Sequence, residues 1–281
     1  MRILKSIKEV REQIKLWKRD GLTVGLVPTM GYLHEGHESL IKRAAKENDK
    51  VVVSIFVNPM QFGPAEDLDN YPRDLDGDSC ICEGAGADLI FNPDAKEMYF
   101  NDFSTFVDMD GLTQGLCGKS RPVHFRGVCT VVSKLFNIAP ANRAYFGEKD
   151  AQQLAIIKRM VRDLNIDIEI IGCTTVRESD GLAKSSRNFY LSQEERKAAS
   201  ILNKSLELAK IKLCNGEKSA KEIRDIIIEN MKKEPLAKVD YVEVVDSKSM
   251  ERIEKIDRSI LVAIAVNIGK ARLIDNFTFE V

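Results

Sequence analysis

The chain has 281 residues, of which 44% are hydrophobic and 30% charged, so it is long enough for two unequal domains and ordinary for a globular protein. Lysine and arginine number 42 and aspartate and glutamate 43, and the net charge of -1 offers no global attraction to nucleic acid or membrane surfaces. No apolar run approaches the roughly 20 residues of a membrane span, and the N-terminus lacks the apolar core of a secretory signal. We therefore expect a cytoplasmic protein without nucleic-acid or membrane partners.

The six cysteines predict no disulfide framework, because none form a C-x-x-C pair and a chain of this length builds a core without cross-links. We expect reduced and mostly packed thiols. The cysteines are Cys80, Cys82, Cys117, Cys129, Cys173 and Cys214.

Strand-like and helix-like segments alternate through the first half of the chain. The run from Val51 to Val57 is rich in β-branched residues, as in a strand covered on both faces. Alternation of this kind predicts an α/β fold with a doubly wound, Rossmann-like parallel sheet. The expected helices span residues 6–19, 36–47, 73–83, 125–136 and 150–164, and the expected strands span residues 22–27, 51–57, 88–91, 143–146 and 166–171.

The pattern changes near residue 176. Two amphipathic helices, at 193–213 and 220–232, precede strands at 239–245, 260–266 and 271–274. This order predicts a smaller α+β C-terminal domain. We place the domains at residues 1–175 and 176–281, with the first expected to bind the ligands and the second to act as a lid.

The first chemical motif follows the first strand, where open α/β sheets bind their ligands. Gly36 is expected at the start of the next helix, where backbone N–H groups attract anions. His34 and His37 are three residues apart, share the first helical turn and are suited to donating hydrogen bonds to a developing phosphate charge. A metal pair and structural histidines are the alternatives. The motif reads Val27-Pro28-Thr29-Met30-Gly31-Tyr32-Leu33-His34-Glu35-Gly36-His37.

A second motif lies near the domain boundary. Lys184-Ser185-Ser186-Arg187 offers hydroxyls and a guanidinium, which suit a triphosphate and a leaving pyrophosphate. Alone, such a segment is more often a solvated loop. Combined with H-x-G-H in this order, it resembles the paired motifs of the H-I-G-H and K-M-S-K-S nucleotidyltransferase superfamily.

Polar residues follow two further strands. Asn58 and Gln61 lie among Pro, Met and Phe, which is typical of a pocket that binds a small polar substrate, although a plain strand exit is the alternative. Gly147 permits close approach of a nucleotide, and Lys149 and Asp150 suit phosphate and ribose contacts, with helix capping as a compatible role for Asp150. The segment Val123-His124-Phe125-Arg126-Gly127 adds a third histidine and an arginine that we expect to be buried.

Together, P-T-M-G-Y-L-H-E-G-H, F-V-N-P-M-Q-F, Y-P-R-D, H-F-R-G-V, F-G-E-K-D-x-Q-Q and K-S-S-R-N resemble the pantothenate synthetase family over nearly the whole chain. The resemblance implies a proton-donating role for His37 and pantoate contacts for Gln61 and Gln153, with Gln61 also near β-alanine. It extends the substrate pocket to Asn58 and Arg126. The implied catalytic residues are His37, His34, Lys149, Ser185 and Arg187. The implied ATP contacts are Met30, Gly31, Tyr32, Leu33, His34, Glu35, Gly36, His37, Gly147, Glu148, Lys149, Asp150, Val176, Lys184, Ser185, Ser186 and Arg187.

The resemblance implies that ATP activates pantoate as a pantoyl adenylate, which β-alanine then attacks to release AMP. It also implies Mg²⁺ on the triphosphate without a dedicated protein site, and a homodimer. Lys184 departs from the methionine common at this position, and it either adds a cation near the phosphates or offers only its backbone. Another nucleotidyltransferase of the superfamily is the main alternative, and a non-catalytic nucleotide-binding module is a third.

Overall fold

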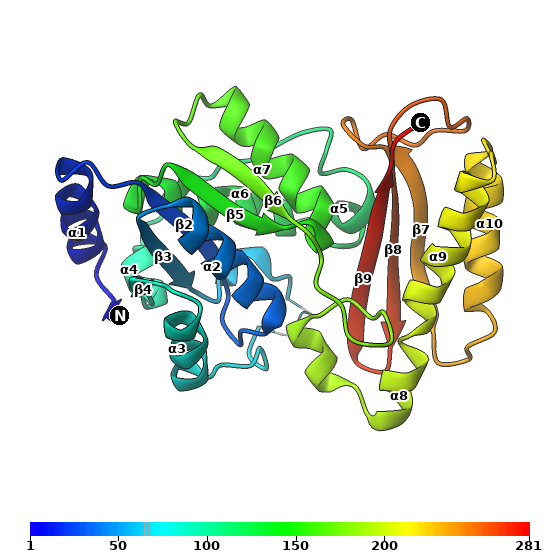
Figure 1. Ribbon diagram of the computed structural model, residues 1–281, viewed down its shortest axis with the longest axis horizontal. Helices are drawn as coiled ribbons and strands as arrows, with labels where there is room; N and C mark the ends of the chain where they lie inside the picture. Colours follow the sequence, from blue (N-terminus) through cyan, green and yellow to red (C-terminus); the bar gives the residue numbers. More distant parts are fainter. Residues whose placement is uncertain (65, 67) are drawn as a thin grey trace. The chain divides into compact units, whose positions relative to one another are not determined.

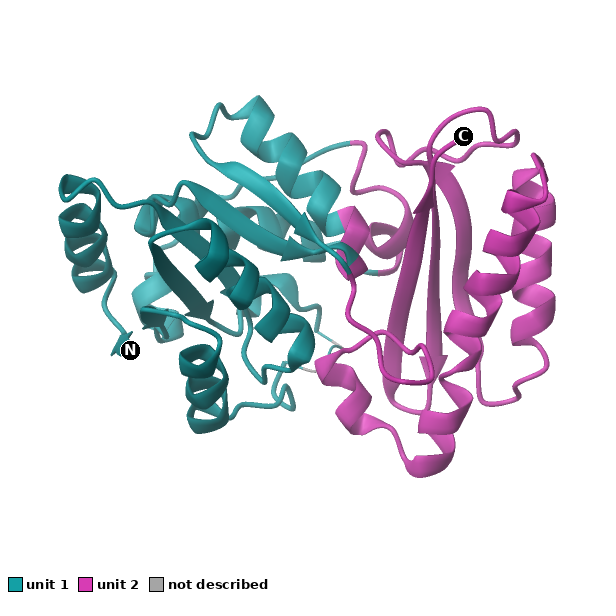
Figure 2. Cartoon of the chain, viewed as in Figure 1, with its two compact units in different colours: residues 1–110, 121–148, 153–174 teal, residues 111–120, 149–152, 175–281 magenta. Residues whose placement is uncertain are grey.

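The computed structural model describes residues 1–64, 66 and 68–281, which form two compact units (Figure 2). Unit 1 contains residues 1–110, 121–148 and 153–174. Unit 2 contains residues 111–120, 149–152 and 175–281. Two short segments, 111–120 and 149–152, therefore belong with the C-terminal residues although unit 1 surrounds them in sequence. The assignment of 1–175 and 176–281 as separate domains, the second a lid, stays a prediction.

Unit 1 is built on one parallel sheet of six strands in the order β1-β4-β3-β2-β5-β6 (Figure 1). The chain winds outward from β2 in one direction and from β5 in the other. The strand order thus reverses between β2 and β5, where open α/β sheets bind ligands beyond the carboxyl ends. The predicted doubly wound α/β fold is confirmed. The strands are β1 (Arg2–Leu4), β2 (Val24–Thr29), β3 (Lys50–Ile55), β4 (Leu89–Phe91), β5 (Arg143–Gly147) and β6 (Glu169–Cys173).

Helices cover both faces of this sheet. Helix α2 contacts β2, β3 and β5 in front of the sheet in Figure 1, and α6 lies behind it. Helix α6 contacts α1, and Ser133 of α6 donates to the sulfur of Met160 of α7. The centres of β2 and β3 are buried for this reason. The helices are α1 (Ile7–Arg19), α2 (Glu35–Glu47), α3 (Leu75–Gly84), α4 (Ala95–Met98), α6 (His124–Ile138) and α7 (Ala151–Asp163), with the 3₁₀ turns η1 (Pro59–Gln61) and η2 (Glu148–Asp150).

Unit 2 is a three-stranded antiparallel sheet in the order β7-β8-β9. Its core joins residues of α9, α10 and the three strands, including Leu206, Ile227 and Ile264. The elements are β7 (Lys238–Asp246), β8 (Ile260–Ile268), β9 (Ala271–Phe279), α5 (Leu116–Ser120), α8 (Gln193–Ala198), α9 (Ile201–Cys214), α10 (Ala220–Met231) and the 3₁₀ turn η3 (Ser186–Tyr190). The predicted α+β character is confirmed.

Several boundaries differ from the prediction. The single helix predicted at 193–213 is wrong, because a turn at Ala199 and Ser200 separates α8 from α9, and the hydroxyl of Ser200 donates to the carbonyl of Lys197. Strand β6 begins three residues later than predicted, after a turn in which Asn165 has φ = 51°. Strand β9 is longer than predicted, and β1, α4 and α5 were missed because they are only three to five residues long.

All six cysteines are free, as predicted, with Cys80 and Cys214 exposed and the other four buried. Within the described part of the chain, no helix is long and apolar enough to cross a membrane.

Candidate active site

The turn after β2 is held by one buried carboxylate. Asp78 of α3 accepts hydrogen bonds from the backbone N–H groups of Tyr32 at 2.9 Å and Leu33 at 2.6 Å. Gly31 and Tyr32 both have left-handed backbones, with φ values of 87° and 52°. A Cβ on Gly31 would lie 2.9 Å from an Asp78 carboxylate oxygen, so glycine is required here. We name residues 30–37 the nucleotide turn.

Asp78 was not among the predicted site residues. Burial raises the pKa of this carboxyl, and the two backbone hydrogen bonds oppose that shift. In the sequence Asp78 is one of several acidic residues near the start of α3, and nothing in that pattern separates a buried carboxylate from a solvated one.

The two motif histidines cap α2. His34 is the N-cap residue, with an extended backbone, and its Nδ1 accepts from the N–H of Gly36 at 3.1 Å. The Nδ1 of His37 accepts from the N–H of His34 at 3.3 Å, and the two ring centroids are 4.1 Å apart. His34 therefore precedes the first helical turn instead of sharing it with His37. A neutral imidazole that accepts at Nδ1 carries its proton on Nε2, so both rings are set as Nε2–H donors.

Asn58 and Gln61 lie together at the end of β3. Asn58 is 1% exposed, and its carbonyl oxygen accepts from the hydroxyl of Tyr99 at 2.8 Å. Its amide nitrogen donates to the Oε1 of Gln61 at 3.0 Å and to the carbonyl of Gly127 at 3.1 Å. The Nε2 of Gln61 lies 3.1 Å from the sulfur of Met30. Asn58 thus orients Gln61, which contacts the first residue of the nucleotide turn.

The start of α6 supports η1 from the other side. A Cβ on Gly127 would lie 2.3 Å from a carbonyl oxygen of η1, so only glycine allows this approach. The Nδ1 of His124 lies 3.1 Å from the carbonyl oxygen of Gln61. Arg121 contacts the other ring nitrogen of His124 at 3.2 Å and forms an ion pair with Glu66. Arg121 and Glu66 were not predicted as site residues.

Arg126, expected to be buried, is exposed. Its guanidinium lies 4.0 Å above the ring of Phe106, and its Nε is 3.9 Å from Asp108. Residues two apart on a helix point in nearly opposite directions, so His124 faces η1 while Arg126 faces away from it. The expected burial of Arg126 is therefore wrong, and its substrate contact stays a prediction.

The two adjacent glutamines of α7 differ sharply. Gln152 is buried, donates to the carbonyls of Leu112 and Gly115 and accepts from the N–H of Cys117. The side chain of Gln153 is partly exposed and makes no hydrogen bond to any residue that the structure describes. Gln152 is therefore structural, whereas Gln153 remains available to a ligand.

The end of β5 leaves room for a ligand. A Cβ on Gly147 would meet no atom within 4 Å, and Glu148 is exposed. In unit 2, Lys149 and Asp150 form an ion pair at 3.2 Å, and the carbonyl of Lys149 accepts from the amide of Asn276 at 2.7 Å.

The Ser-Ser-Arg segment belongs to a hairpin in unit 2, residues 176–188, which we name the serine-arginine loop. The N–H of Lys184 donates to the carbonyl of Val176 at 2.9 Å. Arg177 binds the buried carboxylate of Asp275 in β9 through two hydrogen bonds of 2.7 and 3.0 Å, and donates to the carbonyl of Gly181. The hydrogen bonds to Asp275 raise the pKa of Arg177. Neither Arg177 nor Asp275 was predicted as a site residue.

Lys184 forms an ion pair of 2.9 Å with Glu178, and both side chains are partly buried. The hydroxyl of Ser185 accepts from the N–H of Arg187 at 3.3 Å and caps η3, and Ser186 is buried. The ammonium group of Lys184 is therefore paired with a carboxylate of the same hairpin.

Comparison with known proteins settles the family. The family model for pantoate-beta-alanine ligase matches residues 2–278. The chain belongs to the pantoate-beta-alanine ligase family. It is 68% identical over 280 residues to pantothenate synthetase from Enterococcus faecalis, covering 100% of this chain and 99% of the relative. It is 67% identical to the enzyme of the same name from Clostridium acetobutylicum, with full coverage of both chains.

Solved structures of the family share the fold. The crystal structure of pantothenate synthetase from Thermus thermophilus superposes with a TM-score of 0.92, at 44% identity and 99% coverage of both chains. Pantoate-beta-alanine ligase from Francisella tularensis, solved in complex with beta-gamma ATP and β-alanine, gives a TM-score of 0.80 at 36% identity, covering 99% of this chain and 97% of that one. The ATP-dependent ligation of pantoate to β-alanine is the reaction of this family. The family expected from the sequence is therefore confirmed.

Proposed function

We propose that this chain joins pantoate to β-alanine through a pantoyl-adenylate intermediate, with AMP and pyrophosphate as the other products. The observation that carries the proposal is the contact between Gln61 and Met30 beside the histidine-capped start of α2. A side chain suited to pantoate and the turn suited to ATP are adjacent in one unit. Another nucleotidyltransferase of the superfamily would share the histidines but would not need Gln61 and Gln153 for an acid substrate.

The first step is attack of the pantoate carboxylate on the α-phosphate of ATP, with loss of pyrophosphate. A carboxylate needs no base at neutral pH, so positioning and charge stabilisation dominate. In this proposal Gln61 and Gln153 hold pantoate, and the N-terminus of α2 with the Nε2–H groups of His34 and His37 receives phosphate charge. Lys149, Ser185 and Arg187 are proposed to hold the leaving pyrophosphate.

The second step is attack of the β-alanine amine on the acyl carbon of the adenylate, which forms the amide and releases AMP. We propose that residues 176–281 shield the intermediate, since a mixed anhydride hydrolyses readily. A full-length Arg187→Ala variant tests this role through the amount of adenylate that stays bound after gel filtration without β-alanine. Retention equal to the wild type would contradict it.

Mg²⁺ is proposed to arrive on the triphosphate. Its usual partners in such sites are one or two carboxylates, water and phosphate oxygens. No cluster of three or more histidine, cysteine or carboxylate side chains suited to a metal occurs among the described residues. Bound there, Mg²⁺ would neutralise part of the phosphate charge. A cytoplasmic homodimer is part of the same proposal.

Exchange of labelled pyrophosphate into ATP tests the intermediate directly. We expect exchange that requires pantoate and proceeds without β-alanine, because only the first step is reversed. Exchange without pantoate, or ADP and phosphate as products, would exclude a pantoyl adenylate.

A further inference from the structure

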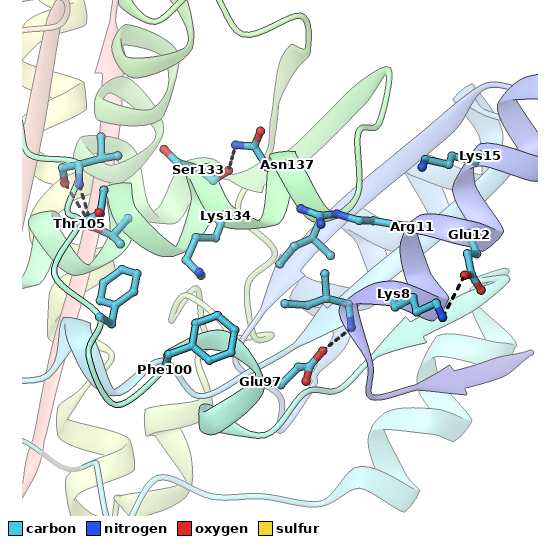
Figure 3. Close-up of a pocket in the computed structure, with 15 residues that line it drawn as sticks. Lys8, Arg11, Glu12, Lys15, Glu97, Phe100, Thr105, Ser133, Lys134 and Asn137 are labelled. Atoms are coloured by element: carbon cyan, nitrogen blue, oxygen red, sulfur yellow. Dashed lines mark hydrogen bonds and ion pairs between the residues drawn. The ribbon is translucent and has the colours of Figure 1, made fainter.

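A pocket of about 700 Å³ lies on unit 1, away from the residues assigned above (Figure 3). Its walls come from α1, α4, α6 and the segment 100–107. The volume is within the ~300–1,000 Å³ of typical small-molecule sites. None of the predicted site residues line it.

Several cations of this pocket have no counter-ion. Arg11 and Lys15 of α1 and Lys134 of α6 make no ion pair with any residue that the structure describes. Burial and, after it, the positive charge of Arg11 lower the pKa of Lys134. Arg11 and Lys134 are therefore the pair of like charges that repel each other across the pocket.

The two carboxylates that line the pocket, Glu12 and Glu97, contact groups other than Arg11 and Lys134. Glu12 lies 3.9 Å from the ammonium of Lys8, one turn earlier on the same helix. Glu97 accepts a hydrogen bond from the N–H of Ile7 at 2.7 Å. Neither carboxylate pairs with Arg11 or Lys134, and the lining holds four cationic side chains against two carboxylates, so positive charge is in excess.

Two aromatic side chains, Phe100 and Phe103, belong to the apolar part of the pocket. The Lys134 ammonium lies 5.1 Å from the ring centroid of Phe103 and 5.5 Å from that of Tyr99. Phe100, which lines the same pocket, is 73% exposed (Figure 3). A large aromatic side chain exposed beside unpaired cations is suited to a ligand with a flat apolar group and negative charge.

We propose that this pocket binds a small organic polyanion with a flat apolar group, whose charges lie between Arg11 and Lys134. The argument rests on charge complementarity: the bound anion removes the repulsion between the two cations and pairs each of them. Phe100 supplies a surface for the apolar group. The proposal is independent of the ligation chemistry, since it uses none of the residues assigned to that reaction.

Fluorescence anisotropy with pyrenetrisulfonate, a flat aromatic trianion, tests the proposal on the full-length protein. We expect saturable binding that weakens about tenfold or more in Arg11→Gln and in Lys134→Gln, because each removes a charge-assisted contact. Lys8→Gln is the matched control, since Lys8 lines the same pocket but faces Glu12, and it should change the affinity less than about threefold. A distant control is Lys42→Gln on α2, whose ammonium pairs with Glu38.

Equal affinity in all four variants, or no saturable binding by the wild type, would overturn the proposal. Sedimentation of the same proteins measures whether a second copy of this chain, and not a small molecule, occupies the pocket. A dimer that Arg11→Gln and Lys134→Gln dissociate, together with an absence of probe binding, would also overturn it. Circular dichroism and the thermal transition of each variant verify folding.

Discussion

The nucleotide turn of unit 1 and the serine-arginine loop of unit 2 achieve their shapes by different means. In the nucleotide turn, backbone N–H groups donate to one buried carboxylate, Asp78, and to the ring nitrogens of His34 and His37. In the serine-arginine loop, charged side chains pair with each other: Arg177 with Asp275, Lys184 with Glu178, and Arg196 of α8 with Asp180.

This difference has consequences for both catalysis and stability. A turn fixed through its backbone keeps its shape while its imidazoles act on a ligand. A loop fixed by ion pairs depends on both partners, because removal of one leaves a buried charge uncompensated. Substitutions in the loop should therefore affect stability most, and those in the turn should affect the reaction.

The largest effect is expected for Arg177→Ala. It leaves Asp275, whose side chain is 1% exposed, without its guanidinium, and should lower the free energy of unfolding by about 3–5 kcal/mol. Urea unfolding measures this value. Arg196→Ala is the matched control, because its partner Asp180 is 39% exposed and the loss should stay near ~1 kcal/mol or below. Equal losses in the two variants would show that burial of Asp275 does not set the cost.

His37→Ala tests the nucleotide turn. Loss of one donor to a developing phosphate charge should slow pantoate-dependent pyrophosphate exchange about 10²–10³-fold, with a smaller effect on unfolding than Arg177→Ala. Rapid-quench measurement of adenylate formation gives the rate of the chemical step. Near wild-type exchange by a folded variant would remove His37 from the reaction.

The sequence predicted the doubly wound parallel sheet because strongly apolar strands alternate with amphipathic helices. It also placed His34, His37 and Gln61 beyond the carboxyl ends of strands, where the structure has them. These features follow from local periodicity and from short motifs, which one sequence displays directly.

The contacts that hold the turn and the loop in place could not be predicted from the sequence, because the two partners of each contact are far apart in the chain. Asp78 lies 46 residues from Tyr32, and Asp275 lies 98 residues from Arg177. No local pattern marks such pairs. The burial predicted for Arg126 was wrong for a related reason, since the motif around it does not show which helix face meets η1.

Gln153→Ala and Gln61→Ala test the two glutamines of unit 1 that are proposed to bind pantoate. Each should weaken pantoate binding by about 1–3 kcal/mol, because a substrate oxygen loses its hydrogen-bond partner, and should leave ATP binding nearly unchanged. Calorimetric titration with each substrate measures both. Gln152→Ala is the control, since its buried amide serves the fold and its loss should lower stability without a specific effect on pantoate. A collapse of ATP binding in Gln153→Ala would contradict the assignment.

Asp78→Asn tests the carboxylate that holds the nucleotide turn. An amide has one acceptor oxygen in place of two, so one of the two N–H groups loses its partner at a cost of about 1–3 kcal/mol.

The same variant tests the pH dependence of stability. Because the pKa of Asp78 is raised above its ordinary 3.8, its titration favours the folded state at low pH, and that contribution is lost as pH rises through the folded-state pKa. The stability advantage of the wild type over the variant should therefore shrink from about pH 3.5 upward. Urea titrations of both proteins across that range measure it, and a growing advantage would give the pKa shift the opposite sign.

The smallest effect is expected for Lys184→Met, which restores the residue common in the family motif. Glu178 already neutralises the Lys184 ammonium within the hairpin, and the backbone N–H of Lys184 is bound to Val176. Lys184→Met leaves Glu178 without this partner, but that carboxylate is 27% exposed and water can solvate it. We therefore expect a loss of about 1 kcal/mol in unfolding free energy, well below that of Arg177→Ala, and a change of less than about threefold in ATP affinity. Arg187→Ala is the reference in the same loop and should weaken ATP or pyrophosphate binding about tenfold or more, because a fork of charge-assisted donors is lost. Isothermal titration of both variants with ATP at two salt concentrations shows whether Lys184 contacts the phosphates as Arg187 is proposed to do. If Lys184→Met weakened ATP binding as much as Arg187→Ala and reduced its salt dependence, Lys184 would reach the phosphates in the bound state, and its pairing with Glu178 would belong to the ligand-free loop alone.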